Sequence, residues 1–131
     1  MIQLRGLHPA LRTHAELTVD YFRRLTGVTP TVTSVTRTID QQRKLYDNFQ
    51  ECRRRGLEGR HVSLNPGMTC AWPANPPGYS AHNYGLAWDS TVPGAHWDTW
   101  DRVRRAFGWR VPDSDRIHAE YPEWRKALGI G

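Results

Sequence analysis

The sequence contains two cysteines, Cys52 and Cys70, which lack the C-x-x-C spacing of common metal and redox motifs. Two cysteines cannot build the framework of a disulfide-rich scaffold, so we expect free thiols in the cytoplasm, or one loop-closing bridge outside it. No segment approaches the roughly 20 apolar residues of a membrane span, and the N-terminus lacks the apolar core of a secretory signal. We therefore expect no membrane insertion and no signal peptide. No internal repeat or linker is found, and the length of 131 residues predicts one domain, 1–131.

The composition is that of a globular protein with an excess of positive charge. Hydrophobic residues make up 38% and charged residues 24%, values outside the range of disordered chains. Eighteen Lys and Arg against thirteen Asp and Glu give a net charge of +5, which favours approach to anionic surfaces such as nucleic acid, lipid headgroups or wall polymers. The arginine runs at 23–24, 53–55 and 102–105 are typical of solvated helix faces, so the charge does not by itself select a partner.

Hydrophobic periodicity and turn residues predict four helices and three short strands. The helices are expected over 8–26, 39–55, 95–107 and 122–128, and the strands over 31–36, 85–92 and 116–119. Residues 56–79 hold four glycines and four prolines and predict a long loop. The inner side of the second helix is expected to carry Ile39, Leu45, Tyr46 and Phe49. This order of elements predicts an α+β fold with helices packed on a small antiparallel sheet.

Three side chains with metal-binding donors lie in or beside the predicted strands. His82 and Asp89 are seven residues apart, and His118 lies on the last predicted strand. Imidazole nitrogen and carboxylate oxygen both suit Zn²⁺, and three protein ligands leave a fourth position open, as catalytic zinc sites do. The sequence therefore predicts a site for one zinc ion in a surface cleft. His96 is a rival third ligand, but its position at the start of a predicted helix favours His118.

The same residues carry a resemblance to a known family. The pattern S-x-H-x-x-G-x-A-x-D of residues 80–89, followed by D-x-x-H at 115–118, resembles the zinc peptidases of bacterial cell-wall peptides. Residues 34–46 also resemble the family's upstream segment, an arginine followed by a Gln-containing helix. The family comprises D-alanyl-D-alanine carboxypeptidases and dipeptidases and the L-alanyl-D-glutamate endopeptidases of phage lysins. The resemblance covers roughly residues 30–122, and the segment HNYGLAWD at residues 82–89 is most similar to the phage and endopeptidase branch.

The resemblance implies a role for each matching position. It implies zinc on His82, Asp89 and His118, with Asp115 as the catalytic carboxylate and Arg37 facing the substrate carbonyl. It also implies that Ser80 forms a hydrogen bond near the substrate or the ligand loop. Gln41 and Tyr84 are further candidates for substrate contact, and Trp72 is an alternative to Tyr84 in lining the cleft.

Two acidic residues are alternatives to Asp115 as the catalytic base. Asp113 is close in sequence, and Glu120 falls on the same strand face as His118 because side chains alternate along a strand. Two departures from the family pattern also stand out. The stretch before the acid is reduced to residues 108–112, and the acid is Asp where carboxypeptidase relatives often have Glu, which favours the endopeptidase branch.

The expected activity is hydrolysis of a peptidoglycan stem-peptide bond, L-alanyl-D-glutamate, by a zinc-activated water. The small size and absent signal favour a monomeric phage-type endolysin with no nucleic-acid partner. We expect it in the host cytoplasm and then, after release by a holin, in the periplasm or cell wall. Two alternatives stay open: a D-Ala-D-Ala carboxypeptidase or dipeptidase, and a non-catalytic basic module that binds cell wall or nucleic acid. Structural zinc sites usually have four protein ligands, so three favour catalysis.

Overall fold

The computed structural model describes residues 4–129 and has the predicted α+β fold. Within that range the α-helices are α1 (Pro9–Thr26), α2 (Ile39–Arg54), α3 (Trp97–Ala106) and α4 (Trp124–Ala127). The strands are β1 (Thr31–Ser34), β2 (Ala87–Thr91) and β3 (His118–Glu120), and 3-10 turns occupy Ala81–Tyr84 and Gly94–His96. Each predicted helix and strand is present within two residues of its expected ends. None of the described helices has the length and apolarity needed to cross a membrane.

The sheet is antiparallel with strand order β1-β2-β3, so β2 is central. Asp89 of β2 pairs with Ser34 of β1 on one side and with His118 of β3 on the other. Residues opposite each other in antiparallel strands have neighbouring side chains on the same face. The strand register therefore brings Asp89 and His118 together.

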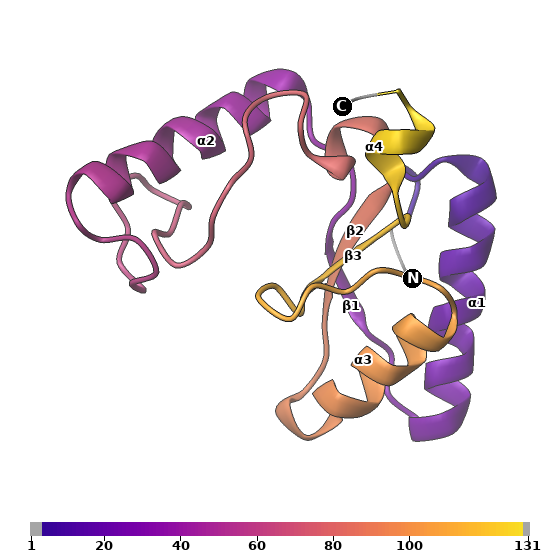
Figure 1. Cartoon of the computed structure of the whole chain (residues 1–131). Helices are drawn as coiled ribbons and strands as arrows, with labels where there is room; N and C mark the ends of the chain where they lie inside the picture. The colour runs from indigo at the N-terminus through magenta and orange to yellow at the C-terminus, as the bar shows by residue number, and fades with distance from the viewer. Residues whose placement is uncertain (1–3, 130–131) are drawn as a thin grey trace.

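The hydrophobic core lies between one face of this sheet and the helices α1 and α3 (Figure 1). Trp88 of β2 meets Trp100 of α3 at 5.9 Å between ring centroids, and Phe22 of α1 lies 4.8 Å from Trp100. Since successive side chains of a strand point to opposite faces, a core-facing Trp88 places Asp89 on the other face. That other face is where the predicted site residues gather.

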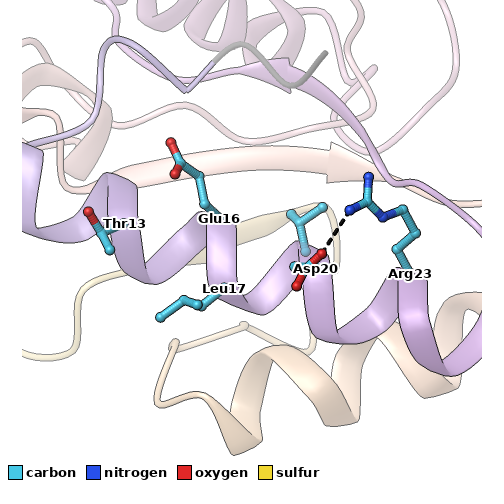
Figure 2. A pocket seen from close by; sticks show the side chains of 6 residues that line it. Thr13, Glu16, Leu17, Asp20 and Arg23 are labelled. Carbon is cyan, nitrogen blue, oxygen red and sulfur yellow. Dashed lines mark hydrogen bonds and ion pairs between the residues drawn. The ribbon is translucent and has the colours of Figure 1, made fainter.

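The outer surface of α1 carries a shallow pocket that takes no part in this grouping. Figure 2 shows Thr13, Glu16 and Leu17 on one part of its wall, and the ion pair of Asp20 with Arg23 on the other. The pocket has a volume of about 350 Å³, and no predicted site residue lines it. It is therefore a surface feature of α1, separate from the site.

The buried side of α2 differs from the prediction. Ile39 is 47% exposed, and Leu45, Tyr46 and Phe49 are half-buried. The buried residues are instead Gln42, Asn48 and Cys52. The prediction is therefore wrong for Ile39 and missed the buried polar residues Gln42 and Asn48, because α2 packs on the 56–79 loop and not on the apolar core.

Polar and covalent links hold that loop to α2. Gln42 Nε2 donates a hydrogen bond to the carbonyl oxygen of Asn75 at 2.7 Å. Cys52 of α2 and Cys70 of the loop form a disulfide, and both are buried. Of the two states expected for the cysteines, the structure has the loop-closing bridge and no free thiol. Large apolar side chains of this loop, such as Val62, Trp72 and Tyr79, stay exposed, so burial alone does not fix the loop and the bridge adds a constraint.

Candidate metal centre

The side chains predicted as zinc ligands converge on the face of the sheet opposite the core. One donor atom from each of His82, Asp89 and His118 lies within 4.8 Å of the other two. Asp89 Oδ1 is 3.1 Å from Nε2 of His82 and 3.2 Å from Nδ1 of His118. Positions 29 residues apart in sequence are thus brought to one point, as the prediction of a shared site requires.

His82 is held by the short turn that precedes β2. Ser80 caps this turn, and its Oγ accepts a hydrogen bond from the backbone N–H of His82 at 3.3 Å. The turn ends at Gly85, with φ of 69°, where an added Cβ would lie 2.7 Å from the carbonyl oxygen of Gly6. His82 Nδ1 contacts the carbonyl oxygen of Val35 at 2.5 Å. A carbonyl oxygen only accepts, so Nδ1 donates to it, and Nε2, which faces Asp89, is the nitrogen that a metal ion can bind.

His118 is oriented in a comparable way by Glu120. The Nε2 of His118 lies 2.7 Å from Oε1 of Glu120, while its Nδ1 faces Asp89. Glu120 Oε2 also forms an ion pair with Arg110 at 3.3 Å. The carboxylate of Glu120 therefore accepts from Nε2–H and leaves Nδ1 toward the cluster, an arrangement common for metal-binding histidines. Glu120, the alternative catalytic base, is thus already engaged with a predicted ligand.

When no metal ion is bound, the electrostatics of the cluster favour an ionised Asp89 beside a positively charged His118. Burial disfavours ionised Asp89, but hydrogen bonds from His118 and His82 outweigh it and hold the pKa of Asp89 well below its usual range. Burial also disfavours a charged His118, yet its hydrogen bonds to Asp89 and Glu120 raise the pKa of His118 to about 9. A metal ion must therefore displace a proton from His118 in order to bind.

This donor set fits a zinc ion. It offers two imidazole nitrogens and one carboxylate oxygen, and each imidazole has its second nitrogen held by a carbonyl or carboxylate oxygen. His82 and Asp89 are 1% and 5% exposed, whereas His118 lines a cavity of about 430 Å³. The cluster is thus buried at His82 and Asp89 and can be reached from the cavity at His118. Within residues 4–129, no other group of side chains has such a metal-binding arrangement.

Arg37 lies directly against this cluster. Its backbone N–H donates to the carbonyl oxygen of His82 at 3.1 Å, and its Nη2 donates to Asp89 Oδ2 at 3.3 Å. The guanidinium has five N–H donors, so this contact leaves others free. The side chain is 26% exposed, which keeps it within reach of a bound molecule.

Asp115 lies in the turn before β3 and is half-buried. Its carbonyl oxygen accepts a hydrogen bond from the backbone N–H of His118 at 3.1 Å. Burial raises the pKa of Asp115 above its ordinary value, opposed by the charge of His118 and reinforced by that of Asp89. A raised pKa brings a carboxylate closer to the range in which it exchanges protons effectively near neutral pH. Asp113 is exposed instead and pairs with Arg105.

The segment that carries Asp115 is fastened to α3 by a network that the sequence analysis missed. Arg104 is fully buried and donates both to Asp101 Oδ1 at 2.5 Å and to the carbonyl oxygen of Arg116 at 2.7 Å. Arg116 Nη2 in turn donates to Asp101 Oδ2 at 2.8 Å. The interpretation of residues 102–105 as a solvated helix face is therefore wrong for Arg104. Asp101, one turn earlier on the helix, was the available signal.

The residues predicted to contact substrate lie at three different places. Ser80 lines the cavity beside His118. Gln41 lines a separate hollow of about 350 Å³ together with Arg37, and its Oε1 accepts from the backbone N–H of Thr38. Tyr84 lines neither hollow, and its hydroxyl donates to the carbonyl oxygen of Gly78 at 2.7 Å. Ser80 and Gln41 thus flank the cluster, while Tyr84 supports the loop.

Comparison with known proteins yields likeness in structure but not in sequence. No protein-family model matches this sequence, and no curated protein matches it. A variant of the vancomycin-resistance D,D-pentapeptidase VanY from a VanB-type cassette, in complex with Zn(II), is 24% identical with a TM-score of 0.61. The match covers 95% of this chain and 77% of that one. VanYB in complex with D-alanine-D-alanine gives the same TM-score and identity, and 76% of its chain is covered.

Two further solved structures are similar over the same 95% of this chain. The LdcB LD-carboxypeptidase is 15% identical with a TM-score of 0.60 over 70% of its length. DacB from Streptococcus pneumoniae is 16% identical with a TM-score of 0.54 over 71% of its length. These likenesses establish that the chain has the fold of VanY and LdcB.

Proposed function

We propose that the protein is a zinc-dependent peptidoglycan peptidase. The observation that carries the proposal is the convergence of His82, Asp89 and His118 beside an open cavity. The fold adds support, because solved structures that share it include a pentapeptidase with Zn(II) and one with D-alanine-D-alanine. Three ligands in place of the four usual for a structural zinc site also favour catalysis over a binding module.

Hydrolysis of a peptide bond at this site needs a metal ion, a carboxylate that transfers protons, a donor to the carbonyl oxygen, and groups that orient the two imidazoles. When bound, zinc would lower the pKa of a water molecule from 15.7 to about 7 and polarise the scissile carbonyl. Asp115 would accept the proton of the attacking water and return it to the leaving amine as the C–N bond breaks, a role typically worth 10²–10⁴-fold. Arg37 would donate to the carbonyl oxygen as it gains negative charge. Val35 and Glu120 would hold the two imidazoles in the orientation that presents Nε2 of His82 and Nδ1 of His118 to the metal ion.

The bond that we propose is L-alanyl-D-glutamate in the stem peptide. Its support is the aspartate at 115 and the residues 82–89, both of which resemble the endopeptidase branch. The specific alternative is a D-Ala-D-Ala carboxypeptidase, which the similarity to VanYB in complex with D-alanine-D-alanine favours. We also propose that the protein acts as a monomeric phage-type endolysin, which a holin releases from the host cytoplasm to the cell wall.

Digestion of purified peptidoglycan with the zinc-loaded protein tests both the activity and the bond. New amino-terminal D-glutamate, identified by mass spectrometry, is expected for the endopeptidase, whereas released D-alanine would show the carboxypeptidase. The matched control is Asp115→Asn, which should retain one zinc ion and lose turnover. Wild-type protein that binds one zinc ion but releases neither product would overturn the proposal.

A further inference from the structure

The cavity beside His118 carries a charge arrangement that the proposed chemistry does not use. His118 and Ser80 form the part of its wall nearest the metal cluster. Four charged residues complete the wall: Arg110, Glu120, Glu123 and Arg125. A group bound there would lie immediately beside the predicted zinc ligands.

Two of these four charges are already matched. Glu120 pairs with Arg110 at 3.3 Å and also accepts from His118. Glu123 and Arg125, in contrast, have no ion-pair partner among residues 4–129. The cavity therefore offers one free carboxylate and one free guanidinium.

Both side chains are exposed, and that of Arg125 is held by its surroundings. The guanidinium of Arg125 lies 5.3 Å from the ring centroid of the buried Trp124, and its Nη2 donates to the carbonyl oxygen of Tyr79 at 3.3 Å. Glu123 has φ of 56°, and within the described range it is the one non-glycine residue in the left-handed region. Such backbone strain persists where the surrounding structure fixes it, and it often occurs at binding sites. The guanidinium of Arg125 is thus held at the cavity wall, and the backbone of Glu123 fixes where its side chain leaves the chain.

We infer that this cavity binds a zwitterionic α-amino acid group of the stem peptide, an inference that rests on the proposed function. A carboxylate and an ammonium on one carbon would meet Arg125 and Glu123 respectively. The free end of meso-diaminopimelate has this chemistry and follows D-glutamate in one class of stem peptide. Lysine at the same place provides the ammonium but no carboxylate. The protein therefore distinguishes diaminopimelate-type from lysine-type peptidoglycan.

Binding of two synthetic tripeptides tests the inference without requiring turnover. L-Ala-γ-D-Glu-meso-diaminopimelate and its L-lysine counterpart are titrated by calorimetry into zinc-loaded Asp115→Asn protein. The diaminopimelate peptide should bind roughly tenfold more tightly, as one additional charged hydrogen bond at a partly exposed site predicts. Arg125→Gln in this background should remove the preference and leave lysine-peptide binding unchanged. Glu123→Gln should weaken both peptides equally.

Lys126→Gln is the matched control, since Lys126 is an exposed neighbour on α4 that does not line the cavity. It should leave both affinities unchanged. Equal binding of the two tripeptides, or a preference that survives Arg125→Gln, would overturn the inference. A preference found together with wild-type protein that hydrolyses neither tripeptide would support this site and count against the proposed endopeptidase, so the two failures are distinguishable.

Discussion

Arg104 and Arg116 are joined by a hydrogen bond of 2.7 Å from the buried guanidinium of the first to the backbone carbonyl oxygen of the second. The carboxylate of Asp101 lies between their two side chains and accepts from both. Through these contacts α3, which packs on the core face of the sheet, fixes the segment that carries Asp115 on the opposite face. The position of the proposed base thus depends on a buried charge network.

Removal of the buried arginine should therefore be costly. Arg104→Met leaves the carbonyl oxygen of Arg116 without its donor and removes one of the cations beside Asp101. We expect a loss of about 3–5 kcal/mol in the free energy of unfolding, as for other broken buried pairs. Denaturant unfolding measures it. Arg102→Met, at an exposed position of the same helix, should change stability by less than about 0.5 kcal/mol. Equal effects of the two variants would show that the network contributes nothing specific.

Replacement of Glu120 should weaken metal binding although this residue is not a predicted ligand. Glu120→Gln removes the charge that holds Nε2–H of His118, so Nδ1 is less firmly presented. Loss of such a supporting partner typically lowers metal affinity by about 10–100-fold. Competition against a chelator of known affinity measures the change. Glu16→Gln, on the outer side of α1, is the control, and an unchanged zinc affinity in Glu120→Gln would contradict the assigned role.

Zinc affinity should rise with pH. The raised pKa of His118, about 9, means that this imidazole carries a second proton, and so a positive charge, in the metal-free protein at neutral pH. Binding must release that proton, so the contribution of His118 is a tenfold gain in affinity per pH unit below about pH 9. Calorimetry in buffers of different ionisation enthalpy should detect the released proton. Affinity that does not vary between pH 6 and 8 would contradict this prediction.

His118 should also make the folding stability of the metal-free protein fall as pH rises, opposite to the rise in zinc affinity. A folded-state pKa above the unfolded value of about 6.5 means that the charged His118 stabilises the fold fully below about pH 6.5. This stabilisation is lost as pH rises through about 9. Thermal unfolding of metal-free protein should show the loss, and His118→Gln should reduce it. A wild-type curve that matches the variant across this window would rule out the assignment.

The disulfide should contribute measurably to stability. A bridge that closes a loop of 18 residues restricts the unfolded chain by about 3 kcal/mol. The double variant Cys52→Ser, Cys70→Ser should therefore unfold at lower denaturant concentration. Reductant should shift the wild-type protein in the same direction and leave the double variant where it is. A wild-type protein that unfolds identically with and without reductant would contradict this.

The local parts of the fold could be predicted from the sequence, because they rest on local patterns. Amphipathic periodicity located α1 and α3, and β-branched residues located β1. The pairing of His82 with Asp89 could be foreseen since one turn and one strand connect them. The addition of His118 required the strand register, which a sequence pattern suggests but does not determine.

The parts that could not be predicted depend on partners distant in sequence. The polar part of the inner side of α2 was missed because only apolar positions were expected to face inward, whereas Gln42 faces the backbone of the long loop. Arg104 was assigned to a solvated face because buried arginines are rare, and its burial depends on Asp101 together with the carbonyl oxygen of Arg116. In both cases a polar contact across the structure overrides the local pattern.

The bridge between Cys52 and Cys70 also has a chemical consequence. With both cysteine sulfur atoms bonded to each other and buried, no thiolate is present to capture mercury or cadmium or to react with an alkylating reagent. Iodoacetamide should therefore leave the oxidised protein unmodified. A soft toxic metal that reaches it would have to compete for nitrogen and oxygen donors, for which such ions have less preference.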